Sequence, residues 1–188
     1  MKLEELAKMG KPIEVIFVDL DGVLVDFHRP LAALYGLDPD TLSDAEWAQI
    51  GEWGLGIPKD DLWQRVQAEG SRFWAQLPKL AWTDALWAAC KAAAPQVVVL
   101  TTPGPFAESA AGKWSWVKEQ LGTQDMLIGR PKEVCSKPGH VLIDDRAGYG
   151  PKWTAAGGVL LPLKRPWNPD GIAPEQLIAG LEAYAEQG

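Results

Sequence analysis

Three short runs of apolar residues constrain the fold of this chain more than any other feature. They are VIFV (15–18), VVVLTT (97–102) and VLID (141–144), and each ends at a polar or turn residue. Such continuous runs are typical of strands that are buried on both faces of a parallel sheet. A fourth run, GVLLPL (158–163), has the same character but is weakened by Pro162. We therefore expect a parallel sheet at the centre of the molecule.

Helical patterns lie between these runs. DALWAACKAA (84–93) is amphipathic, and FAESAAGKWSWVKEQLG (106–122) carries apolar residues at helical spacing before Gly122, a residue type that commonly ends helices. Strands that alternate with helices predict an α/β fold, in which right-handed crossovers flank a Rossmann-like parallel sheet. A chain of 188 residues suits one domain.

The stretch after the first strand interrupts this alternation. Segments 40–55 and 58–77 have helical patterns, Ser43 and Glu46 are spaced as in a capping box, and neither segment contains a convincing strand. We expect a small helical cap that is inserted after the first strand and lies over the carboxyl edge of the sheet. A proline-rich loop and one closing helix follow the last strand. The predicted division of the chain is a core of residues 1–27 and 81–188 and a cap of residues 28–80.

Acidic and hydroxyl side chains collect where three of the predicted strands end. The pairs are Asp19 and Asp21, Thr101 and Thr102, and Asp144 and Asp145. Ligands of open α/β sheets bind at the carboxyl ends of the strands, so we expect these pairs to lie together. Four carboxylates in one place cannot all stay ionised without a cation, and oxygen ligands without nearby His or Cys favour Mg²⁺. A single aspartate at a strand end is usually a turn residue, but three similar strand ends indicate a functional site.

The composition disfavours several partners. The formal net charge of −7 argues against a nucleic acid polymer or an anionic membrane, although a small phosphate ester can still enter a locally positive pocket. No stretch approaches 18 uninterrupted apolar residues, and the first twelve residues lack the apolar region of a signal peptide, so a cytoplasmic protein is the default expectation. Cys90 and Cys135 show no ligand spacing, and we expect free thiols.

The motifs DLDGV, VVVLTT, a downstream lysine and LIDD resemble the four motifs of the haloacid dehalogenase (HAD) superfamily. The D-x-D form of the first motif is characteristic of the phosphatases in that superfamily. Further segments occur in the order seen in the 5'(3')-deoxyribonucleotidase family, and the likeness covers most of residues 13–168. These segments are DLDGVLVDF, FWAQLPKL, TTP, KWSWVKEQLG, GRPKE and VLIDDR.

The resemblance implies catalytic roles for individual residues. Asp19 would be the nucleophile that forms an aspartyl-phosphate, and Asp21 would act first as general acid and then as general base. Thr101 would donate its hydroxyl to a phosphate oxygen, and a lysine would neutralise the phosphoryl group. Lys132, within GRPKE, resembles the lysine context of the family better than Lys137 does, so we favour Lys132.

The resemblance also implies a metal and a class of substrate. Mg²⁺ would be held by Asp19, by Asp21 through its main-chain carbonyl, and by one or both of Asp144 and Asp145. The substrates would be nucleoside monophosphates, with deoxy forms favoured. The candidate substrate-binding residues are Phe27, Thr102, Phe73, Trp74 and Arg146. For the two aromatic residues of the cap, packing in the core is the more common role, and Arg146 could instead pair with a neighbour.

Other functions remain open at this point. A phosphatase of another small metabolite, such as a sugar phosphate, would share every catalytic residue and differ in the cap. A non-catalytic binding module would keep the fold and lose the chemistry, but the full set of motif residues argues against it. A nucleoside triphosphate site of the P-loop type is excluded, because no G-x-x-x-x-G-K-[ST] motif is present. Tryptophans of the cap could form a homodimer contact.

Overall fold

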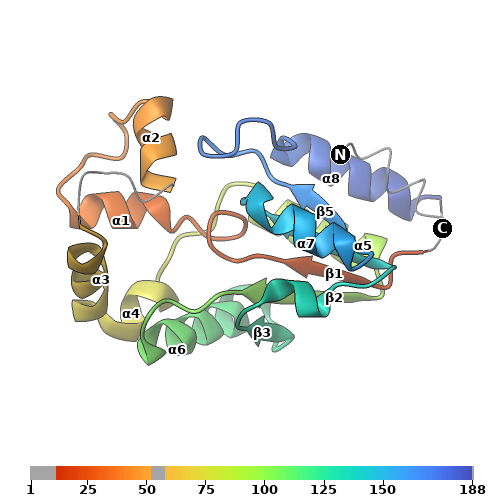
Figure 1. The fold of residues 1–188 in the computed structure, drawn as a ribbon, viewed down its shortest axis with the longest axis horizontal. Helices are drawn as coiled ribbons and strands as arrows, with labels where there is room; N and C mark the ends of the chain where they lie inside the picture. The colour runs from red at the N-terminus through yellow and green to blue at the C-terminus, as the bar shows by residue number, and fades with distance from the viewer. Residues whose placement is uncertain (1–11, 52–57, 188) are drawn as a thin grey trace.

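A five-stranded parallel sheet forms the centre of the computed structural model, which describes residues 12–51 and 58–187 (Figure 1). The strands lie in the order β3-β2-β1-β4-β5. They are β1 (Val15–Val18), β2 (Gln96–Thr101), β3 (Met126–Ile128), β4 (His140–Asp144) and β5 (Val159–Pro162). The predicted α/β fold and its four apolar strands are confirmed. The sequence pattern does not reveal β3, because this edge strand has three residues and none of them is fully buried.

Helices cover both faces of the sheet. On one face lie α5 (Thr83–Ala93), α6 (Ala107–Trp116) and α8 (Pro174–Ala185), and on the other lies α7 (Gly150–Ala155). The alternation of β1 shows the two faces: Ile16 and Val18 join the larger apolar cluster, whereas Phe17 packs against Trp153 of α7. The chain moves outward from β1 in both directions, and right-handed crossovers then require helices on opposite faces.

The helix that follows β2 ends where the sequence predicts. After Trp116, α6 continues as one π-helical turn, η2 (Val117–Leu121). Gly122 stops this turn with a left-handed φ of 68°, a conformation that costs a glycine little. Two short 3₁₀ turns, η3 (Lys132–Cys135) and η4 (Ala147–Tyr149), complete the core.

Four helices occupy the described part of the predicted insertion and form a separate group at the end of the molecule opposite α8 (Figure 1). They are α1 (His28–Leu34), α2 (Asp44–Gly51), α3 (Lys59–Ala68) and α4 (Gly70–Ala75). The capping box is present: the Ser43 N–H donates to Glu46 Oε2 over 2.8 Å, and the Glu46 N–H donates to Ser43 Oγ over 3.4 Å. The part of the predicted helical segment at 52–55 and the N-terminal residues 1–11 lie outside the described residues.

The cap is attached to the core mainly through α4 and α6. A Cβ at Gly112 would lie 2.5 Å from the Cβ of Trp74, so only glycine allows the two helices to approach this closely. The Trp116 indole N–H donates to the carbonyl of Leu77 over 2.7 Å and fixes the segment that returns from the cap. The cap therefore has a defined position against the sheet.

Two expectations about the whole chain concern the membrane and the cysteines. Among the described residues, no helix is long and apolar enough to cross a bilayer. Cys90 and Cys135 are free thiols, as the sequence predicts. Burial raises the pKa of Cys90 to about 12, so this thiol is protonated at neutral pH and packs as a small apolar side chain.

Candidate active site

The pairing register of the sheet brings the three predicted strand ends together. β1 lies between β2 and β4, and Val18 is level with Val99 on one side and Ile143 on the other. The N–H of Asp19 donates to the carbonyl of Ile143 over 2.9 Å, which continues the ladder for one more residue. Asp19 therefore lies beside the end of β4, where Asp144 stands.

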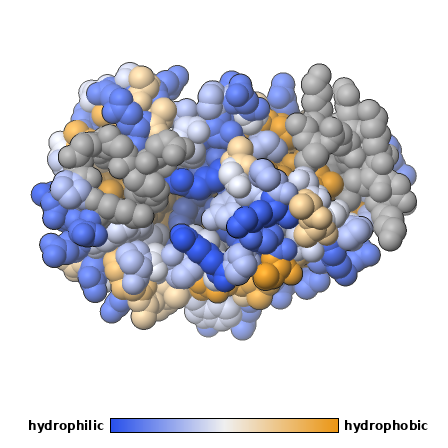
Figure 2. All heavy atoms as spheres, viewed as in Figure 1, coloured by the Kyte–Doolittle hydropathy of each residue, from blue (hydrophilic) through white to orange (hydrophobic). Residues whose placement is uncertain are grey.

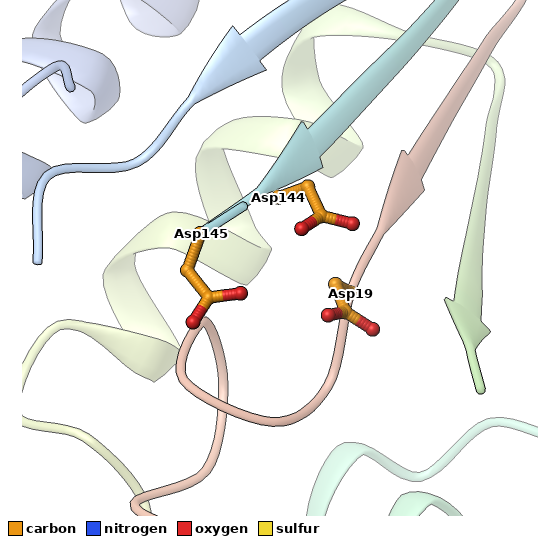
Figure 3. Close-up of side chains that lie close together, drawn as sticks. All are labelled: Asp19, Asp144 and Asp145. Atoms are coloured by element: carbon orange, nitrogen blue, oxygen red, sulfur yellow. The ribbon is translucent and has the colours of Figure 1, made fainter. Parts of the chain in front are cut away.

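Asp19, Asp144 and Asp145 form a buried carboxylate cluster (Figure 3). Each offers one carboxylate oxygen, and these oxygens lie within 4.8 Å of one another. Burial, followed by the charge of Asp19, raises the pKa of Asp144 to about 6. Burial, followed by the charges of Asp144 and Asp19, raises the pKa of Asp145 well above its ordinary value. The cluster is therefore a site where negative charge is costly unless a cation is present.

Lys132 lies at the centre of this cluster. Its Nζ is 2.9 Å from Asp19 Oδ1 and 2.7 Å from Asp144 Oδ2, and its side chain is 1% exposed. Burial by itself lowers the pKa of Lys132, but the two carboxylates raise it above its ordinary value, so the lysine is charged. Lys137, the alternative in the sequence, is more than half exposed and pairs with Glu14 over 3.1 Å. Of the two lysines, the structure brings only Lys132 to the aspartates.

A second buried lysine, Lys113 of α6, is a residue that the sequence reasoning missed. Its Nζ donates to Asp21 Oδ2 over 2.5 Å, to Thr101 Oγ1 over 3.1 Å and to the Thr102 carbonyl over 2.6 Å. Burial raises the pKa of Asp21, and the charge of Lys113 opposes this effect. Lys113 thus joins the D-x-D motif to the end of β2.

A sequence signal for Lys113 does exist. Five buried residues of α6 and η2 follow the spacing of one helix face: Ser109, Gly112, Lys113, Trp116 and Val117. A lysine in the middle of such a stripe is unusual, because lysine is almost never fully buried without a partner. The position predicts a buried acceptor, which is Asp21 here.

The turn after β1 depends on Gly22. This residue has a φ of 79°, and its N–H donates to the carbonyl of Val25 over 2.9 Å. A Cβ at this position would overlap the carboxylate of Asp145, so glycine lets the loop approach the cluster. On its other side, Asp145 Oδ2 accepts a hydrogen bond from the Trp167 indole over 2.7 Å.

Asp26, the third acid of the first motif region, does not join the cluster. Its Oδ1 accepts a hydrogen bond from the N–H of Arg29 over 3.0 Å, and its side chain lies near the Arg29 guanidinium. Asp26 therefore stabilises the start of α1, which is a structural role.

Asp19 and Asp145 of the cluster, together with Asp21 and Lys113, form the floor of a pocket of about 670 Å³ between the cap and the core, whereas Asp144 lies buried behind them. Figure 2 shows a hollow here, bordered by strongly hydrophilic residues. On the cap side, Phe27, Trp63 and Trp74 line the pocket, and the rings of Phe27 and Trp74 stack at 5.1 Å. Phe73 does not line the pocket; it packs edge-on against Phe27 at 5.9 Å and so supports the wall.

The remaining candidate residues also line the pocket. Thr102 and Arg146 lie on the core side, and the Arg146 N–H donates to Asp144 Oδ1 over 2.9 Å. His28, which the sequence reasoning missed, is buried in the wall, and its ring lies 4.0 Å from that of Trp167. Burial, followed by the charges of Arg165 and Arg146, lowers the pKa of His28 well below its ordinary value, so this imidazole is neutral.

The donor set fits a divalent cation. The four site aspartates (Asp19, Asp21, Asp144 and Asp145) face two lysines, which leaves two negative charges when all the groups are ionised. Asp145 Oδ1 is buried and has no hydrogen-bond partner among the described residues, so it is available as a ligand. Oxygen donors of this kind suit hard cations such as Mg²⁺.

The sequence matches no protein-family model and no curated protein. Comparison of the fold with solved structures does find similar proteins. A five-stranded parallel sheet with a cap inserted after β1 and aspartates at its carboxyl edge defines a class of α/β proteins, and solved structures of that class superpose on this chain.

The similar structures belong to HAD-type proteins. The HAD protein YfnB of Bacillus subtilis, bound to magnesium, has a TM-score of 0.59 at 13% identity, over 91% of this chain and 99% of that one. An L-2-haloacid dehalogenase has a TM-score of 0.54 at 16% identity, and the match covers 94% of this chain and 100% of the dehalogenase chain. A HAD family hydrolase from Deinococcus radiodurans, with bound phosphate and sodium, has a TM-score of 0.52 at 16% identity. This match covers 90% of this chain and 88% of the hydrolase chain. The chain therefore has the HAD fold.

Proposed function

We propose that this protein is a magnesium-dependent phosphomonoesterase that acts through an aspartyl-phosphate on Asp19. The observation that carries the proposal is the pairing of each motif aspartate with its own buried lysine: Asp19 with Lys132 and Asp21 with Lys113. One carboxylate is thereby held for attack and the other for proton transfer, on the same side of one pocket.

In the first half of the reaction, the Asp19 carboxylate attacks phosphorus and the ester P–O bond breaks. Asp21, in its protonated form, gives its proton to the departing alkoxide, so the alcohol leaves neutral. In the second half, Asp21 takes a proton from water, and the resulting hydroxide attacks phosphorus. The acyl-phosphate bond breaks, inorganic phosphate leaves and Asp19 is regenerated.

The two lysines and Thr101 position these groups. Lys132 holds Asp19 through Oδ1 and places a positive charge beside the carboxylate that attacks phosphorus. Lys113 holds Asp21 beside the end of β2 and donates to Thr101 Oγ1, the buried hydroxyl that would donate to a phosphate oxygen. Each lysine also faces an aromatic ring: Trp74 lies 4.9 Å from Lys113, and Tyr149 lies 4.8 Å from Lys132. These rings limit the access of water to the ammonium groups.

The residues that would hold Mg²⁺ are Asp19, Asp144 and Asp145, together with Asp21 through its main-chain carbonyl. When bound, the ion supplies positive charge that offsets the phosphate dianion and the carboxylates. YfnB is a neighbour with magnesium and the Deinococcus hydrolase one with phosphate, which supports the proposal by analogy.

The neighbouring dehalogenase raises a second reaction for the same fold. A carboxylate can displace halide from carbon without an acid, because halide is a stable anion. An alkoxide leaving group needs a proton, and Asp21 is placed to give one. The second carboxyl group therefore favours phosphate ester hydrolysis over dehalogenation.

Nucleoside monophosphates, deoxy forms favoured, are the proposed substrates, which makes the enzyme a 5'(3')-deoxyribonucleotidase. The wall of Phe27, Trp63 and Trp74 supports this, because aromatic side chains accept the flat face of a nucleobase. The cap of residues 28–80 would cover the core and exclude water from the phosphate.

The test is release of inorganic phosphate from a panel of nucleoside and sugar monophosphates. We expect turnover of nucleotides with Mg²⁺, and none with a chelator or in Asp19→Asn. The isosteric amide keeps the fold and removes the nucleophile, and circular dichroism checks the fold. Turnover of sugar phosphates alone would contradict the nucleotidase assignment, and undiminished activity of Asp19→Asn would contradict the mechanism.

A further inference from the structure

Three basic side chains line the mouth of the pocket, apart from the two buried lysines of the floor. Arg130 precedes η3, Arg146 follows β4, and Lys152 lies on α7; we call these three residues the basic mouth. Among the described residues of the pocket lining, Glu133 is the one acid outside the site aspartates, and its Oε1 lies 3.4 Å from Lys152 Nζ. The Arg130 guanidinium forms no ion pair with any described residue. The mouth therefore carries more positive charge than its own acid offsets.

The charges of the floor are balanced without the basic mouth. Lys113 and Lys132 offset two of the four site aspartates, and the proposed divalent cation would offset the other two when it is bound. Even when Arg146, which has further contacts of its own, is left out of the count, Arg130 and Lys152 with Glu133 keep one net positive charge among the described lining residues. This local excess stands out in a chain whose formal net charge is −7. Such a potential favours an anionic group outside the reaction centre.

The pocket has room for such a group. Its volume of about 670 Å³ far exceeds what one phosphate on the floor fills, and lies within the range of sites for whole cofactor-sized ligands. The aromatic wall on the cap side takes a flat ring, whereas the basic mouth belongs to the core side. The pocket therefore offers three surfaces to a ligand: the carboxylates and lysine of the floor, the aromatic wall and the basic mouth.

We propose that the basic mouth binds a second phosphate of the substrate, so that the preferred substrates are nucleoside bisphosphates rather than monophosphates. This inference rests on the proposed function, because it assumes that the floor binds the phosphate to be removed. The guanidinium group of Arg130 suits a phosphate, since it offers a planar fork of donors, and the ammonium group of Lys152 adds a second positive charge. The alternative role of these cations is general neutralisation of the floor, since Arg146 lowers the pKa of Asp145 against the larger effect of burial.

The experiment compares two substrates that differ only in the second phosphate: a deoxynucleoside 5'-monophosphate and the 3',5'-bisphosphate of the same nucleoside. The measured quantity is kcat/KM from initial rates with Mg²⁺, for the wild type, Arg130→Gln and the double variant Arg130→Gln/Lys152→Gln. Lys91→Gln, an exposed lysine of α5 outside the pocket lining, is the control with the same change of charge. Two or three partly exposed ion pairs give about a tenfold preference for the bisphosphate.

We expect this preference in the wild type and in Lys91→Gln, and its fall to about one in the double variant. Equal kcat/KM for both substrates in the wild type, or an equal loss on both substrates in the double variant, would overturn the inference while the phosphatase function stands. If neither substrate is hydrolysed, the proposed function fails. Calorimetric binding of the two nucleotides to the wild type and the double variant then tests the mouth by itself: tighter bisphosphate binding that the double variant loses supports it, and equal binding overturns it.

Discussion

Replacement of Lys132 by methionine tests how the carboxylate cluster is held in the folded protein. The change removes an ammonium group that lies 2.9 Å from Asp19 and 2.7 Å from Asp144, both largely or fully buried. Removal of one partner of a buried ion pair costs about 3–5 kcal/mol, because the remaining charge is left uncompensated. Protonation limits the loss, since the pKa of Asp144 is already about 6. We therefore expect the lower end of that range at pH 7, about 3 kcal/mol, which corresponds to a fall in Tm of about 6–12 °C.

Lys137→Met is the matched control. The side chains of Lys137 and Glu14 are 57% and 52% exposed, and a surface pair of this kind contributes about 0.2–1 kcal/mol. The assay is urea unfolding in a chelator, followed by the fluorescence of the ten tryptophans. A loss below about 1 kcal/mol for Lys132→Met, or equal losses in the two variants, would refute the argument that Lys132 compensates the buried carboxylates.

Three further outcomes are expected. Because burial raises the pKa of Asp144 from 3.8 to about 6, the folded protein binds this proton more tightly than the unfolded chain. In a chelator, urea titrations should therefore show the free energy of unfolding falling by up to about 3 kcal/mol as the pH rises from about 4 to about 6, and a rise would contradict this. At Gly22, φ is 79° and an added Cβ would lie 2.9 Å from Asp145 Cγ. Gly22→Ala should therefore lower the free energy of unfolding by about 1–2 kcal/mol and weaken Mg²⁺ binding, measured by calorimetry, at least about tenfold. Unchanged Mg²⁺ affinity would argue against a role of this turn in positioning Asp145. Gly112→Ala should lower stability by about 1–3 kcal/mol through overpacking against Trp74, and an unchanged Tm would show that α4 can move aside.

The parts of the fold that could be predicted are those with local patterns. The four apolar runs, the helix that stops at Gly122 and the capping box of Ser43 and Glu46 all depend on neighbours in sequence. β3 could not be predicted in this way, because a short, half-exposed edge strand is specified by its pairing with β2. The packing of α4 against Gly112 could not be predicted from local sequence patterns either, because it joins segments about 40 residues apart.

The candidate site also contains residues that the sequence predicted and residues that it did not. Asp19, Asp144 and Asp145 were expected at one edge, since strand ends of a parallel sheet meet there, and the structure places them within 4.8 Å of one another. Lys113 and Trp167 were missed. Lys113 donates to Asp21 as well as to Thr101 and Thr102, and Trp167 donates to Asp145, so each contacts a motif aspartate that is distant in sequence.

The sequence by itself determined the kind of chemistry available, because residue types and hydrophobic periodicity decide which groups stand at strand ends. Only the tertiary structure decided which lysine lies beside Asp19, since Lys132 and Lys137 are five residues apart in sequence but differ in burial, with side chains that are 1% and 57% exposed. It also decided that the pocket has an aromatic wall and a basic mouth, because these walls combine the cap, the turn after β4 and α7. Such combinations arise from packing between distant segments, which no local pattern encodes.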